Sequence, residues 1–335
     1  MAATQANPPP TAATATTTAT PEPLQSLLTP LHRLAKFKPR SCETSKTAHI
    51  PLLVESIQRS SPPTVVLLGD SMLERLTTTG ASPNSPPSAW PSPTLLDDAA
   101  LAALIPGSSP ERRRRLDGVF NAGVGGDRVQ NVAYRLVGDE DSGHGLGQGQ
   151  PGAEDGGGHP EGGAVGDGDG DGDGDGDGDG PTRGGNDRLP GLLPLLASAG
   201  SVKLWVVHAG TNNMTGSKGL ANRDVEALAV VLRALLGVSR ECRVLLTGLF
   251  YRADVAPSLV DKANGKLKEV VESLNKECLG QDGRMEERVV FLPAPRDVTP
   301  EEHLVDHVHL GLEGYQLWIR ELFPAVVDML RVGTT

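Results

Sequence analysis

Short apolar runs that alternate with amphipathic stretches constrain the fold of this chain most. The first run, residues 64–68, lies between Pro62-Pro63 and Gly69 and is built from β-branched and aliphatic residues, which is typical of a buried strand of a parallel sheet. Four later runs have the same character, at residues 118–121, 202–208, 243–249 and 289–292. Apolar residues at helical spacing predict helices over residues 49–58, 129–136, 189–199, 222–236, 259–279 and 311–331.

Strands that alternate with helices of this length predict a parallel sheet with helices on both faces. Five strands fit a flavodoxin-like, three-layer α/β/α sandwich with a five-stranded parallel sheet. The pattern does not determine the order of the strands.

Low-complexity segments set the domain organisation. Residues 1–46 are rich in Ala, Thr and Pro and end in a short basic stretch, which predicts a disordered N-terminal tail. Residues 47–335 form one predicted domain with low-complexity insertions at about 77–117 and 138–187. The second insertion contains seven consecutive Asp-Gly pairs over residues 167–180, and flexible glycine with self-repelling aspartate cannot bury apolar surface.

The composition argues against several classes of function. The formal charge is −11, and with a pI near 5.2 nucleic acid is not an expected partner. No run reaches the roughly 18 apolar residues that span a bilayer, and the N-terminus lacks the basic and apolar regions of a signal peptide, so we expect a cytoplasmic protein without a membrane anchor. Three cysteines without metal-ligand spacing predict neither a disulfide framework nor a metal site, and we expect no cofactor. Nothing in the sequence indicates the oligomeric state.

Polar and small residues follow three of the predicted strands. Gly69-Asp70-Ser71 follows the first, residues 123–127 the second, and residues 210–213 the third. Because parallel strands end at one edge of a sheet, these segments are expected to lie together. A fourth segment, residues 306–310, precedes the last predicted helix and carries Asp306 and His309 three residues apart.

These segments hold the groups that acyl transfer requires, namely a nucleophilic oxygen, a base, a group that orients the base, and donors for the oxyanion. Ser71 is the candidate nucleophile, although a serine after a strand can also cap the next helix. Asn212 is a candidate donor or a turn residue, and Asn213 is the better turn former. His303 and His307 are alternatives to His309, and Asp297 is an alternative to Asp306.

The four segments, in this order, resemble the successive blocks of the SGNH, or GDSL-type, hydrolase family. Within it they are most similar to the catalytic subunits of the intracellular platelet-activating-factor acetylhydrolase, which share Gly-Asp-Ser-Met, a Gly-Gly-Asp second block and Gly-Thr-Asn-Asn. The resemblance implies Ser71 as nucleophile, His309 as base and Asp306 as its orienting acid. It implies an oxyanion hole made by the N–H groups of Ser71 and Gly126 and the side chain of Asn212.

The activity that the resemblance implies is that of a serine esterase, which hydrolyses small acyl esters, acetyl esters among them, through an acyl-enzyme on Ser71. The expected partner is therefore a small-molecule acyl ester. A catalytically silent binding module with the same fold is the alternative. A nucleotide-binding protein is disfavoured because the second block has no G-x-G-x-x-G spacing and no P-loop lysine.

Overall fold

The computed structural model describes residues 24–78, 118–139, 189–278 and 286–331. Five strands form one parallel sheet: β1 (Val65–Gly69), β2 (Val119–Gly123), β3 (Leu204–His208), β4 (Arg243–Thr247) and β5 (Val289–Leu292). Their order, β2-β1-β3-β4-β5, is that of flavodoxin-like sheets, so the predicted fold class is confirmed and the strand order is added to it. Gly69 pairs with Gly123 on one side and with His208 on the other, so these three strands end level with one another.

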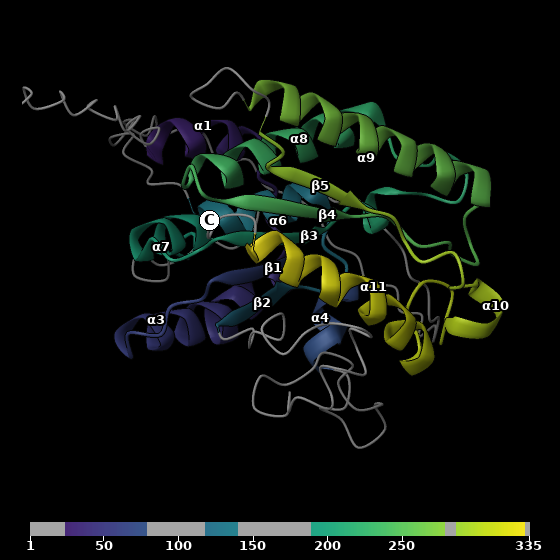
Figure 1. Ribbon diagram of the computed structural model, residues 1–335, viewed down its shortest axis with the longest axis horizontal. Coiled ribbons are helices and arrows are strands. Elements are labelled where there is room, and N and C mark those ends of the chain that lie inside the picture. The colour runs from purple at the N-terminus through teal and green to yellow at the C-terminus, as the bar shows by residue number, and fades with distance from the viewer. Residues whose placement is uncertain (1–23, 79–117, 140–188, 279–285, 332–335) are drawn as a thin grey trace, which may run out of the picture.

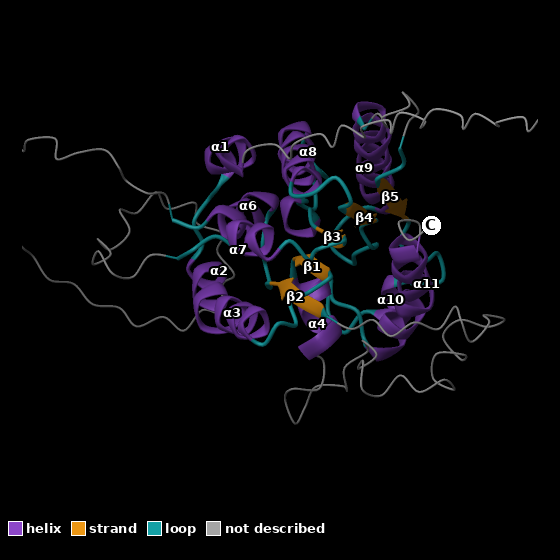
Figure 2. Cartoon of the chain, turned by 60° about the vertical axis from the view of Figure 1, so that its left-hand side comes forward, coloured by secondary structure: helices purple, strands orange, loops and turns teal. Residues whose placement is uncertain are grey.

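Helices cover both faces of the sheet (Figures 1 and 2). One face carries α6 (Val129–Val137), α7 (Leu192–Ala199), α8 (Asn222–Gly237) and α9 (Pro257–Glu277), and the other carries α4 (Ser71–Thr78) and α11 (Leu312–Arg331). Successive strand residues point to opposite faces, so each strand between two helical layers must be apolar throughout. All five residues of β1 are accordingly buried.

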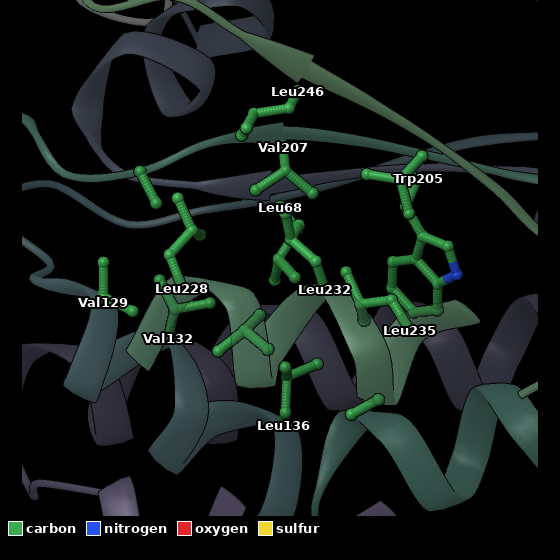
Figure 3. Close-up of a cluster of buried hydrophobic side chains, with 14 of the residues drawn as sticks. Leu68, Val129, Val132, Leu136, Trp205, Val207, Leu228, Leu232, Leu235 and Leu246 are labelled. Atoms are coloured by element: carbon green, nitrogen blue, oxygen red, sulfur yellow. The ribbon is translucent and has the colours of Figure 1, made fainter. Parts of the chain in front are cut away.

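Two hydrophobic cores result, one on each side of the sheet. Figure 3 shows the first, where Leu68 and Val207 of the strands face Leu228 and Leu232 of α8. The second lies between Val65 and Leu67 and the fully buried Trp318 of α11. Trp205 is fully buried in β3.

The N-terminal segment corrects the predicted domain boundary. Residues 24–58 form four helical elements: α1 (Leu24–Leu34), α2 (Pro39–Thr44), the π-helix η1 (Ser45–His49) and α3 (Ile50–Gln58). The predicted disordered tail over residues 1–46 is therefore wrong for residues 24–46. The reason is an amphipathic pattern within the low-complexity region, because Leu24, Leu27, Leu28 and Leu31 share one helix face, which packs on α6 and α8.

The remainder of that tail, residues 1–23, lies outside the described residues. So do residues 79–117 and 140–187 of the two predicted insertions, which include the Asp-Gly pairs. Two short elements near the candidate site are the 3-10 helix η3 (Thr211–Asn213) and α10 (Pro300–His303). The helices of the described ranges were all too short or too polar to cross a membrane. The three cysteines are free thiols.

Candidate active site

Ser71 begins α4 directly after β1, with only Asp70 between the strand and the helix. Glycine allows this tight junction, because a Cβ on Gly69 would lie 1.9 Å from the carbonyl oxygen of His208. A Cβ on Gly123 would likewise lie 2.3 Å from the backbone nitrogen of Glu74. The first N–H groups of a helix have no intrahelical acceptor, so the N–H of Ser71, at the start of α4, makes no hydrogen bond within the helix.

Asp306 and His309 lie in the loop between α10 and α11. The Val305 N–H donates to the carbonyl of His309 at 2.8 Å, which closes the loop. Asp306 Oδ1 accepts the backbone N–H groups of Val308 at 2.8 Å and His309 at 2.7 Å. The carboxylate is thus held by its own turn, with Oδ2 left to face the imidazole.

The three side chains form one hydrogen-bonded chain. His309 Nδ1 lies 2.7 Å from Asp306 Oδ2, and His309 Nε2 lies 2.9 Å from Ser71 Oγ. An ionised Asp306 can only accept, so Nδ1 carries the imidazole proton and Nε2 is left to accept from the Ser71 hydroxyl. Residues 238 positions apart in the sequence are thereby in direct contact.

The electrostatics favour this arrangement of protons. Burial works against the charge of Asp306, but the hydrogen bonds from His309 and Val308 hold its pKa at about 2. Burial lowers the pKa of His309 below its ordinary value, against the opposing effect of Asp306. Near neutral pH the site therefore holds a carboxylate next to a neutral imidazole.

Two of the three candidate oxyanion donors, Gly126 and Asn212, come from segments that hydrogen bonds connect. Gly126 has a φ of 74°, in the left-handed region that favours glycine. Asn212 Nδ2 donates to the carbonyl of the adjacent Asp127 at 3.0 Å, and the amide keeps a second N–H. Arg128 Nε donates to the carbonyl of Asn212 at 3.2 Å, which closes the connection in the other direction.

Two other residues considered from the sequence, His303 and Asn213, bind elsewhere. His303 Nδ1 accepts the Thr299 N–H at 3.1 Å, within its own helical turn. Asn213 Oδ1 accepts the Val129 N–H at 2.9 Å, so it caps α6 from a different segment. Of the three histidines between residues 303 and 309, His309 is the one in contact with Ser71.

The sequence did not predict a buried ion pair that lies beneath the loop containing Gly126. The side chains of Asp127 and Arg135 are fully buried, with Arg135 Nε 2.7 Å from Asp127 Oδ2. Asp127 Oδ1 also accepts the hydroxyl of Ser41, and Arg135 donates to the carbonyls of Ala122 at 2.6 Å and Gly69 at 2.9 Å. Nothing local distinguishes such a pair from two solvent-exposed charges eight residues apart.

A second buried polar group, His208, lies at the end of β3. Its Nδ1 is 2.7 Å from Thr247 Oγ1 and its Nε2 is 3.1 Å from Thr211 Oγ1. Burial lowers the pKa of His208 to about 3, so the ring is neutral. The sequence gives no signal of the Thr247 contact, because Thr247 lies 39 residues away on β4, whereas Thr211 follows His208 by three residues. Within the described ranges, no group of three His, Cys, Asp or Glu side chains is arranged to hold a metal ion.

Several solved structures resemble the chain in fold. A family two carbohydrate esterase from Clostridium thermocellum, in complex with cellohexaose, is 14% identical with a TM-score of 0.43, covering 80% of this chain and 64% of its own. Est24, a carbohydrate acetylesterase from Sinorhizobium meliloti, is 14% identical with a TM-score of 0.40, covering 80% and 99%. A carbohydrate esterase family 3 protein from Talaromyces cellulolyticus is 12% identical with a TM-score of 0.41, covering 81% and 99%. No protein-family model and no curated protein matches the sequence.

Proposed function

We propose that this chain is a serine esterase of the SGNH type that hydrolyses small acyl esters, acetyl esters among them. The observation that carries the proposal is the contact of Ser71 Oγ with His309 Nε2 at 2.9 Å. The other ring nitrogen of His309 contacts Asp306, so the three side chains are hydrogen-bonded in series. A serine, a base and a group that orients the base are the parts of an activated nucleophile.

In the proposed first step, Ser71 Oγ attacks the carbonyl carbon of the ester while its proton moves to His309 Nε2. Asp306 stabilises the imidazolium through Nδ1–H. The carbonyl oxygen becomes an oxyanion, for which the N–H groups of Ser71 and Gly126 and the Asn212 amide are the proposed donors. The intermediate then collapses, the bond to the alcohol oxygen breaks, and His309 returns the proton to the departing alcohol.

In the second step, His309 takes a proton from water, and the resulting hydroxide attacks the acyl group on Ser71. The acid leaves and the proton returns to Ser71 Oγ, so the enzyme is regenerated with no net change in protonation. A neutral imidazole is needed at the start of both steps, and the lowered pKa of His309 supplies it near neutral pH.

The test is hydrolysis of p-nitrophenyl acetate by the wild type and by Ser71→Ala. We expect a loss in kcat of about 10⁴-fold or more, because the nucleophile and its base act as a unit. Ser198→Ala is a matched control, since the Ser198 hydroxyl is exposed on α7 and bonds its own helix.

Labelling with a fluorophosphonate distinguishes the enzyme from a silent binding module of the same fold. The wild type should be labelled at Ser71 and the Ser71→Ala variant should not. A folded wild type that neither reacts with the probe nor hydrolyses esters would contradict the proposal.

A further inference from the structure

Two cations, Lys38 just before α2 and Arg40 in its first turn, lie against the loop of residues 124–128 that follows β2. Lys38 Nζ donates to the carbonyl of Gly125 at 3.3 Å. A Cβ on Gly126 would lie 2.6 Å from the same Nζ, so the ammonium group rests against this glycine. Arg40 binds both carboxylate oxygens of Glu74, at 3.3 and 3.2 Å, and lies over Gly125.

Positive charge exceeds negative charge around this loop. Arg40 is paired with Glu74, and Arg135 is paired with the buried Asp127. Lys38 lies 3.9 Å from Asp127, whose charge Arg135 already neutralises, and Arg128 binds the carbonyl of Asn212. Of these six charged residues four are cations, in a chain whose formal charge is −11.

Lys38 is also open to solvent at the edge of the sheet that holds Ser71. Its side chain is 30% exposed, whereas Asp127 and Arg135 beneath it are fully buried. Burial lowers the pKa of Lys38, Asp127 opposes that effect, and the neighbouring arginines lower the pKa further. The Lys38 ammonium is therefore repelled by the neighbouring arginines, and an incoming anion would offset that repulsion. The anion would also give Lys38 a charge-assisted hydrogen bond in place of its 3.9 Å contact with Asp127.

We propose that Lys38, with Arg128 beside it, binds a negatively charged group of the ester substrate, a carboxylate or a phosphate. The inference rests on the proposed esterase function, because it places this anion next to Gly126, one of the proposed oxyanion donors. It narrows the substrate class from small acyl esters in general to anionic ones. The charge can lie on the acyl part or on the alcohol part, and both are tested.

The experiment compares charged and neutral esters on the full chain. One pair is 4-acetoxybenzoate and its methyl ester, with the charge on the alcohol part. The other is p-nitrophenyl hemisuccinate and p-nitrophenyl butyrate, with the charge on the acyl part. For Lys38→Met we expect kcat/KM to fall about tenfold for at least one charged ester, the scale of one charge-assisted hydrogen bond, and to stay within about twofold for both neutral esters.

Two further variants control for structure. Lys38→Arg keeps the charge and should keep most of the activity on the charged ester. Lys268→Met removes an exposed lysine of α9 and should leave kcat/KM unchanged for the charged and the neutral esters alike. Raising the salt concentration from about 0.05 to 0.5 M should lower the activity of the wild type on the charged ester selectively, because salt screens a partly exposed pair.

If Lys38→Met lowered kcat/KM equally for charged and neutral esters, the inference would be overturned. Lys38 would then act by holding the loop through its hydrogen bond to the Gly125 carbonyl. Unchanged kinetics on every ester would overturn it as well. If Lys38→Met does not fold, Lys38→Gln and the salt dependence of the wild type decide in the same way. Ser71→Ala assayed on the same esters tests the proposed function separately, since residual turnover there would contradict the esterase mechanism whatever Lys38 does.

Discussion

Asp70 and Ser71 are adjacent residues whose environments differ sharply. The Asp70 side chain is fully buried, and its Oδ1 accepts the Met72 N–H at 3.0 Å. Burial raises the pKa of Asp70 to about 7, although the Met72 N–H opposes the shift. Below about pH 7 most Asp70 carboxyl groups in the folded protein are therefore protonated and carry no charge.

Asp70 should therefore make stability depend on pH. Its pKa is about 7 in the folded protein and about 3.9 when unfolded, so between these values the folded state binds more protons. Stability contributed by Asp70 is present below the unfolded value and is lost as pH rises toward 7. Relative to Asp70→Asn, the wild type should lose on the order of 1 kcal/mol per pH unit across this window.

The measurement is urea unfolding of both proteins between pH 4 and pH 8. Other titrating groups act in both proteins, so the difference between them isolates Asp70. A difference that did not change with pH would mean that Asp70 is ionised in the folded state.

At the scale of elements, the ion pair of Asp127 and Arg135 connects α6 to the ends of two strands. Arg135 on α6 reaches the carbonyl of Gly69 in β1 and that of Ala122 in β2. Ser41 of α2 binds the same Asp127 carboxylate. The loop with Gly126 is thereby held between the sheet and the N-terminal helices.

Arg135→Met should destabilise the protein by about 3–5 kcal/mol at neutral pH, because it leaves the Asp127 charge buried without its partner. Urea unfolding measures the loss, and Asp127→Asn/Arg135→Met should recover part of it. Arg233→Met is the control: its pair with Glu277 is about half exposed, so the change should stay within about 1 kcal/mol. Equal effects of the two arginine variants would contradict the role of the buried pair.

At the scale of the whole molecule, the residues before β1 belong to the folded domain. α1 packs across α6 and α8, and its Leu31 is fully buried in the core that Figure 3 shows in part. The same connection that leaves α1 carries Lys38 to the candidate site. The N-terminal region thus contributes both to the core and to the rim of the site.

Leu31→Ala should lower the free energy of unfolding by about 2–5 kcal/mol, as expected for a large-to-small change in a core. Leu52→Ala removes the same atoms from a leucine of α3 that is 57% exposed, and should change it by no more than about 0.5 kcal/mol. Thermal or urea unfolding compares the two variants directly. If Leu31→Ala were as mild as Leu52→Ala, α1 would not be an integral part of the domain.

The five strands, the helices between them and the four segments of the candidate site were all predicted from the amino-acid sequence. These follow from local rules, since side-chain periodicity reports the secondary structure and parallel strands end at one edge. The contact between Ser71 and His309 agrees with the predicted pairing. The chemical roles of these residues remain predictions.

Four features became known from the fold alone: the strand order, the burial of Asp127 with Arg135, the inclusion of α1 in the domain and the approach of Lys38 to Gly126. Each depends on contacts between segments far apart in the chain, and the residues involved carry no local mark of their partner. A lysine after a low-complexity region has the composition of a solvated tail. It lies at the candidate site because the Leu face of α1 packs on α6 and α8 and fixes where the next residues run.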